Sequence, residues 1–188
     1  MSTITMNSDY ALGLITRHFQ RLEFYLSIFS WGLMGKNQRI GQTVTAHLSF
    51  SKLLTLVNAL FRERTQKPIL IGQLNAIIAQ AAEAEQRRNR AIHSAYIQTS
   101  DDLNARRIRY KVTAKLKKGL VYQWEDTSVD DLLDIAVNLR QTTELLVGFI
   151  ADMRVPLTID FSCFDFYEQA PPPKRKQKQT SDHDDIPF

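Results

Sequence analysis

The sequence is poor in the residues and motifs on which many sites depend. It contains a single cysteine, Cys163, so no internal disulfide can form and a reducing compartment is expected. Phe161, Phe164 and Phe166 surround this cysteine in the sequence. We therefore expect its thiol to be buried as a small hydrophobe, without a nucleophilic role. The composition is also helix-friendly, with only seven glycines, which indicates α structure.

Several motifs are absent as well. No His and Cys residues, and no clustered carboxylates, have the spacing of metal ligands, so we expect no metal and no cofactor. The sequence has neither a Gly-rich phosphate loop nor a serine-hydrolase elbow. Residues 1–9 do not resemble a secretory signal, and the apolar residues 24–34 are too few to cross a bilayer. A cytoplasmic protein without a membrane partner is expected.

The chain is long enough for one domain with a tail. Of its 188 residues 44% are hydrophobic, so a sizeable core can be buried. The formal net charge of +4 is small and unevenly spread, and local clusters matter more than the total. From Ala170 onward three prolines are followed by basic and then acidic residues. We expect a folded domain over residues 1–168 and a disordered linker and docking tip over residues 169–188.

Apolar periodicity predicts four helices. In the first, Leu14, His18, Leu22, Tyr25 and Phe29 recur at spacings of three and four. Residues 41–64 form the second, which is apolar on most sides and is expected at the centre of the bundle. The third begins at Pro68, continues to about residue 96, and has Leu74, Ile77, Ile78 and Ala81 on its inner face.

A capping box opens the fourth helix, where Ser128 precedes Asp131 in place of the usual Glu or Gln. Its predicted core face consists of Leu132, Ile135, Ala136, Leu139, Leu146 and Ile150. Between the third and fourth helices, residues 107–116 alternate strictly between polar and apolar, which predicts a half-buried strand. Residues 117–119 form a turn and residues 120–124 the return strand. The predicted fold is mainly α: a four-helix up-down bundle with an inserted β-hairpin.

The third helix changes character along its core-facing side. At 100° per residue, Glu85 and Arg88 share the arc of its apolar residues, Asn89 lies at the edge of that arc, and His93 lies further round. Buried charge is costly unless it is paired or used. Two explanations fit: an ion pair between Glu85 and Arg88, or a polar pocket where the bundle meets a partner or a second copy.

Residues 88–93, Arg-Asn-Arg-Ala-Ile-His, resemble the motif of the HEPN family of small helical bundles. The motif is an Arg, often followed by a polar residue, with a His four to six positions beyond it. Arg88 and His93 are the matching pair, although Arg87 also fits the wider spacing. The resemblance covers about residues 10–150, and the predicted hairpin is compatible with it as an insertion.

The resemblance implies a metal-independent endoribonuclease, with a toxin or antiviral-defence role, whose active site forms in a homodimer. His93 would assist attack of an RNA 2′-hydroxyl on the adjacent phosphate, and Arg88 would stabilise the charge that develops there. Asn89 would orient the imidazole or bind phosphate, with Glu85 as a supporting residue. An antitoxin that silences the enzyme would be a further partner.

One face of the predicted hairpin is basic. Its residues are Arg107, Arg109, Lys111, Lys115 and Lys117. Two interpretations stay open: a surface that follows the phosphates of RNA or DNA, or an exposed strand that its charge keeps soluble and guards against edge aggregation.

The last residues resemble the tip of bacterial single-stranded DNA-binding proteins, which end in acids followed by Ile-Pro-Phe. Here the tip consists of Asp182, Asp184, Asp185, Ile186, Pro187 and Phe188. The resemblance implies docking onto the bacterial DNA-repair or replication proteins that bind this tip, with the terminal Phe as an aromatic anchor. His183 and the basic linker depart from the usual pattern. A generic acidic tail, or self-inhibition by the tip in a basic groove, are the alternatives.

Two functions therefore follow from the sequence. The first is a HEPN-type endoribonuclease that the tail docks to repair or replication factors. The second is a non-catalytic dimeric interaction module whose tail competes for the pockets that bind the single-stranded DNA-binding protein tip.

Overall fold

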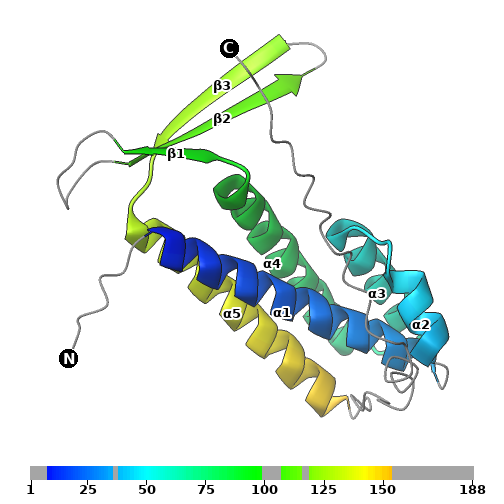
Figure 1. The fold of residues 1–188 in the computed structure, drawn as a ribbon. Coiled ribbons are helices and arrows are strands. Elements are labelled where there is room, and N and C mark those ends of the chain that lie inside the picture. Colours follow the sequence, from blue (N-terminus) through cyan, green and yellow to red (C-terminus); the bar gives the residue numbers. More distant parts are fainter. Residues whose placement is uncertain (1–7, 36–37, 99–106, 116–118, 154–188) are drawn as a thin grey trace, which may run out of the picture.

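A computed structural model describes residues 8–35, 38–98, 107–115 and 119–153, with the backbone alone for residues 97–98, 107–115 and 119–124. Its elements are α1 (Ser8–Met34), α2 (Gln38–Thr45), α3 (Phe50–Arg64), α4 (Pro68–Ile92), β1 (Ala95–Gln98), β2 (Arg107–Lys115), β3 (Gly119–Asp126) and α5 (Val129–Asp152). The protein is mainly helical, as its composition predicted (Figure 1). Within the described residues, no helix combines the length and apolar character that a membrane span requires.

The first helix lies at the centre of the bundle and contacts all four of the other helices. The prediction that residues 41–64 would be central was therefore wrong. The buried row of α1 also differs from the predicted one, because Ile15, Phe19 and Leu26 are buried whereas His18 and Tyr25 are only half-buried. Helix α1 is apolar on more than one side, so its neighbours α3 and α5 decide which row is covered.

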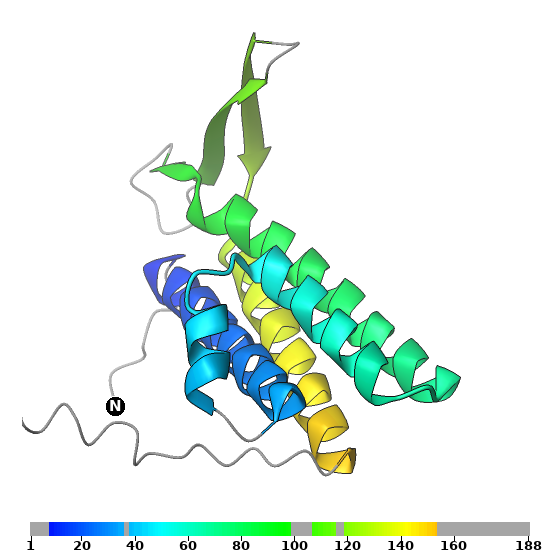
Figure 2. The ribbon, with the colours of Figure 1, turned by 90° about the vertical axis from the view of Figure 1, so that its right-hand side faces the viewer.

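The long helices do not alternate up and down. Phe19 packs on Phe50 at the start of α3, with ring centroids 4.8 Å apart, and Phe29 packs on Phe61 near its end, at 6.0 Å. Helices α1, α3 and α5 therefore run in one direction and α4 runs against them (Figures 1 and 2). This corrects the predicted up-down order.

The reversal comes from a break inside the predicted second helix, which is in fact α2 and α3. The Trp31 indole of α1 donates a hydrogen bond to Thr45 Oγ1 (2.9 Å), which holds the short α2 back along α1. Residues 46–49 then turn, and Ser49 caps α3 by accepting from the Lys52 amide (3.4 Å). Because α2 has already reversed the direction of the chain, α3 starts beside the middle of α1 and runs parallel to it.

Helix α4 ends earlier than the predicted residue 96. Its last helical residue is Ile92, and His93 forms the C-cap. Tyr96 belongs to β1, and its hydroxyl donates to the Ala91 carbonyl (2.8 Å). This bond satisfies one of the carbonyls that a helix end leaves unpaired, so the aromatic ring stays against the bundle although the helix has ended.

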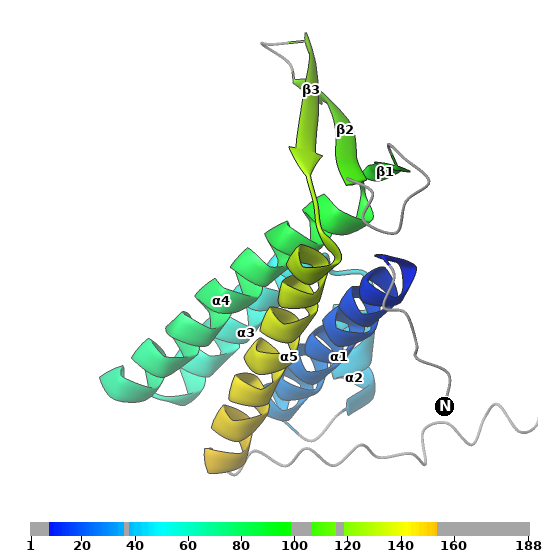
Figure 3. The ribbon, with the colours of Figure 1, turned by 90° about the vertical axis from the view of Figure 1, so that its left-hand side faces the viewer.

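An antiparallel sheet, in the order β1-β2-β3, connects α4 to α5 and projects beyond the end of the bundle (Figures 1 and 3). Strand β1 pairs with the first four residues of β2, and β3 pairs with its last eight, residues 108–115. The sequence did not predict β1. At the start of α5 the capping box is confirmed: Ser128 Oγ accepts from the Asp131 amide (3.0 Å), and Asp131 accepts from the Ser128 amide (2.8 Å).

The substitution Gly41→Ala should make the folded protein less stable. The added Cβ would lie 2.7 Å from Trp31 Cδ1 and 2.9 Å from Cγ, at the base of a ring held by its bond to Thr45. We expect a loss of about 1–3 kcal/mol in the free energy of unfolding, measured by chemical denaturation, as for an overpacked core. The control Gly13→Ala, where nothing lies within 4 Å, should gain about 0.5–1 kcal/mol. Equal effects of the two substitutions would contradict the packing argument.

Candidate functional site

The ionic side of α4 lies where the sequence predicted it. Glu85, Arg88 and Asn89 are half-buried, between the fully buried Ala84 and Ala91. The core-facing side of this helix therefore changes from apolar to polar over its last two turns. His93, at the C-cap, is exposed.

Arg88 is the residue with the most unusual surroundings. Its guanidinium carbon lies 4.5 Å from the centroid of the Phe19 ring, and Nη1 donates to Asn89 Oδ1 (2.8 Å). Nε is buried and has no hydrogen-bond partner. A cation is stabilised over an aromatic face, but a buried donor without an acceptor costs free energy.

The expected ion pair between Glu85 and Arg88 does not form. In the part of the chain that the structure describes, the Arg88 guanidinium has no carboxylate oxygen within 4.0 Å. Glu85 is on the same side of α4 but does not neutralise it. Of the two explanations for the ionic stripe, the ion pair is therefore wrong, and the polar pocket where the bundle meets a partner or a second copy stays a prediction.

The structure brings Arg88 and Asn89 together but leaves the His93 side chain separate. The His93 amide donates to the Asn89 carbonyl (3.2 Å), which fixes the backbone at the helix end. Among the described residues, the imidazole makes no hydrogen bond or ion pair. The imidazole is therefore exposed at the end of the helix, where a side chain of this type can accept or donate a proton.

Arg87, the alternative partner for His93, has acidic surroundings. Together with Arg90 it lines a polar pocket of about 210 Å³ between α4, β3 and α5, whose other walls include Glu125, Asp126 and Asp131. Carboxylates repel a phosphate. Arg88, on the Phe19 side, is therefore the better match to the motif.

The basic strand residues lie in β2, apart from Lys117, which falls outside the described residues. Strand alternation puts Arg107, Arg109, Lys111 and Lys115 on one face of the sheet. In the register Arg109 is opposite Tyr96 on β1 and Glu125 on β3. The basic positions thus share a face with Tyr96, whose own side chain packs against the bundle.

Residues 169–188, with the whole docking tip, and Cys163 lie outside the described residues.

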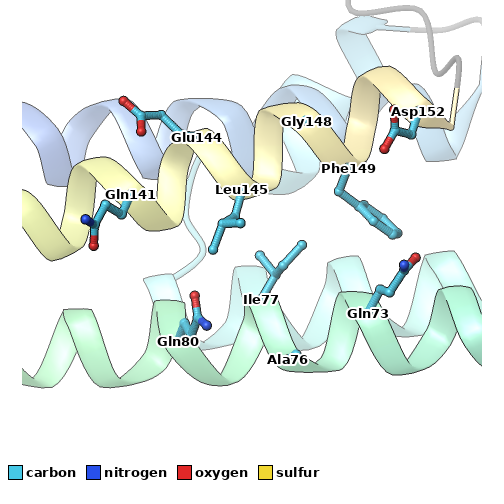
Figure 4. Close-up of a pocket in the computed structure, with 10 residues that line it drawn as sticks. All are labelled: Gln73, Ala76, Ile77, Gln80, Gln141, Glu144, Leu145, Gly148, Phe149 and Asp152. Carbon is cyan, nitrogen blue, oxygen red and sulfur yellow. The ribbon is translucent and has the colours of Figure 1, made fainter.

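A groove between α4 and α5 was not expected from the sequence. It has a volume of about 780 Å³, with Ile77 and Phe149 among its apolar walls and the half-exposed Leu145 beside them (Figure 4). Gln73, Gln80, Gln141, Glu144 and Asp152 supply its polar groups. Leu145 adjoins the predicted core face of α5, and this was the only sign of the groove in the sequence. No group of three or more potential metal ligands occurs in the described part of the chain.

Comparison with family models, curated proteins and solved structures finds no match to this chain. The resemblance to HEPN bundles therefore rests on the sequence of residues 88–93.

His18 lies between α1 and α5 in a group of like charges. Burial lowers the pKa of its imidazole, and the guanidinium groups of Arg17, Arg140 and Arg21 lower it further, whereas Glu144 opposes them. Glu144 also pairs with Arg140 at 3.8 Å. The folded protein therefore favours the neutral imidazole.

This charge group makes stability depend on pH. Because the pKa of His18 is lower in the folded state than its usual value of 6.5, the unfolded chain binds the proton more readily. The free energy of unfolding should therefore fall as the pH is lowered through 6.5 towards the folded pKa. Chemical denaturation between pH 5 and 8 should show a shallower fall for His18→Gln. For Arg140→Gln, which removes one repelling charge, the fall should also be shallower. An unchanged pH profile in His18→Gln would exclude this cause.

Proposed function

We propose that this protein is a metal-independent endoribonuclease of the HEPN type, with Arg88 and His93 as its catalytic residues. The observation that carries the proposal is Arg88 itself: a half-buried guanidinium on the Phe19 ring, without a carboxylate among the described residues. A charge of this kind is costly to bury unless it is paired or used. A phosphate matches the planar guanidinium geometry.

The chemistry needs one base and one stabilising charge. His93 accepts the proton of an RNA 2′-hydroxyl, and the 2′-oxygen then attacks the adjacent phosphorus. As that bond forms, the bond to the 5′-oxygen breaks, and this leaving oxygen takes up a proton from water or an acid. The products are a 2′,3′-cyclic phosphate and a 5′-hydroxyl. Arg88 stabilises the negative charge on the non-bridging oxygens, and Asn89, hydrogen-bonded to Arg88, holds the guanidinium in place.

The RNA strand would approach from the basic face of the sheet. Arg107, Arg109 and Lys111 share that face with Tyr96. The Tyr96 hydroxyl donates a hydrogen bond to the carbonyl of Ala91, two residues before His93. Phosphates bound along β2 would thus lead the strand towards the end of α4. A homodimer would bring two such ends, and two imidazoles, to one RNA.

Purified protein should cleave total RNA in excess EDTA. We expect His93→Ala and Arg88→Ala each to lower the cleavage rate by about 100-fold or more, since each removes a group that acts in the transition state. The matched control is Arg90→Ala, which removes an exposed arginine from the same helix end and should retain most of the activity. Circular dichroism checks that every variant is folded. Folded wild-type protein without cleavage, or full activity in His93→Ala, would favour the non-catalytic interaction module.

The proposed tail function is separable from cleavage. We propose that residues 182–188 dock onto bacterial repair or replication proteins, with the Phe188 ring and carboxylate as anchors. Deleting Phe188 should abolish binding to a protein that binds the tip of single-stranded DNA-binding proteins, measured by fluorescence anisotropy. It should leave the cleavage of naked RNA unchanged. An increase in cleavage after this deletion would instead indicate that the tip inhibits the enzyme.

A further inference from the structure

The groove between α4 and α5 is apolar on its inside. Leu145 and Phe149 point from α5 towards Ile77 of α4, whereas Glu144 points away from α4 (Figure 4). Leu145 is 50% exposed, so the apolar surface that it forms with Ile77 and Phe149 is open between the two helices. Apolar surface gathered in a concave place is typical of a site where another group packs.

Three glutamines line the same groove: Gln73 and Gln80 from α4, and Gln141 from α5. A glutamine amide offers both donors and an acceptor. The backbone of an extended peptide needs partners of both kinds when its N–H and C=O groups leave water. The lining therefore combines apolar contacts with amides from both helices, and this combination fits a peptide segment that carries apolar side chains.

The chain leaves α5 at one end of this groove. Asp152 is the last residue of α5 and also lines the groove. From Asp152 back to Gln141, the groove follows α5 for about 16–17 Å at 1.5 Å per residue. About five extended residues cover that distance at 3.3–3.6 Å each. The residues that follow α5 can therefore reach the whole groove without a long connection.

Residues 157–163 have the pattern of an extended segment with one apolar face. Their sequence is Leu-Thr-Ile-Asp-Phe-Ser-Cys, in which apolar and polar residues alternate strictly. Side chains of an extended chain point to opposite sides in turn, so Leu157, Ile159 and Phe161 share one side. Pro156 comes directly before this pattern and favours an end of the helix. These residues lie outside the described part of the chain.

We propose that residues 157–163 bind in the groove between α4 and α5 of the same chain, as an extended segment whose apolar side packs on Leu145, Phe149 and Ile77. The short connection after α5 gives this segment an effective concentration on the order of millimolar, which a second copy does not have in dilute solution. The polar side of the segment stays towards the solvent. Cys163, on the apolar side of the alternation, is then covered.

The acidic tip of the chain is a poorer match to this groove. Two carboxylates, those of Glu144 and Asp152, lie along it, and Asp182, Asp184 and Asp185 of the tip would be repelled by them. Residues 157–163 carry one acid, Asp160, which the alternation puts on the side away from the groove. The charges therefore favour residues 157–163 over the tip.

The single cysteine reports on this contact in the unmodified protein. Cys163 should react with a maleimide at least about 10-fold more slowly in the folded protein than in denaturant, because a docked segment must open before it reacts. Leu145→Glu should make the reaction fast, since it puts a charge against the apolar side of the segment. The matched control is Val137→Glu: Val137 is 42% exposed on the same helix and does not line the groove. This variant should react as slowly as wild type.

Circular dichroism checks that each variant is folded. Fast reaction of Cys163 in the folded wild-type protein would overturn the proposal. So would a reaction in folded Leu145→Glu that is as slow as in Val137→Glu, because the thiol would then be covered somewhere other than in this groove.

Two substitutions within the segment test which side of it is bound. Ile159→Gln should release Cys163 as Leu145→Glu does, whereas Thr158→Gln, on the other side of the alternation, should leave the reaction slow. Equal effects of the two would refute the extended segment. The rate in wild type should not change on dilution, and a rate that rises on dilution would show that a second copy covers the thiol, which refutes binding within one chain. No RNA is used, so this outcome is separate from that of the proposed cleavage.

Discussion

The contact between Phe29, Phe61 and Phe149 determines how this bundle is built. These rings come from α1, α3 and α5 and meet with centroid separations of 6.0, 6.2 and 5.5 Å. Aromatic rings at such distances prefer tilted and edge-to-face contacts, which place the three helices in register. Since α1, α3 and α5 run in the same direction, α4 is the one long helix among the described residues that opposes them, and its C-terminal end lies beside the start of α1.

The position of Arg88 follows from that arrangement. With α4 antiparallel to α1, its last turns pass Phe19, whose ring also contacts Phe50. The guanidinium therefore packs on an aromatic ring and does not pair with a carboxylate such as that of Glu85. Its charge is stabilised by the ring quadrupole. In the same region the helix ends, and the exposed His93 follows directly.

The sheet gives the molecule two different faces beyond the bundle. Strict alternation along β2 separates basic from apolar positions, and the bond from Tyr96 to Ala91 sets which face turns back towards the helices. The basic positions of β2 thereby share a face with Tyr96.

Local sequence patterns were sufficient to predict much of this structure. Composition predicted a mainly helical chain, the spacing of Ser128 and Asp131 predicted the capping box, and the predicted core face of α5 is buried. The change from apolar to ionic residues around Glu85 and Arg88 was also readable, because one helix turns by a fixed angle per residue. The groove beside Leu145 could not be predicted from the sequence, since it depends on the distance between two helices.

By itself, the sequence determined where most of the helices lie, how α5 begins and which α4 residues break its apolar side, because these features depend on neighbours within a few positions. Only the tertiary structure decided that residues 41–64 form two helices, that α3 runs parallel to α1, and that Arg88 rests on Phe19 without Glu85 as its partner. These features depend on contacts between distant residues, such as Trp31 with Thr45 and Phe29 with Phe61. Periodicity records which side of a helix is apolar, but not which neighbour covers it or in which direction that neighbour runs.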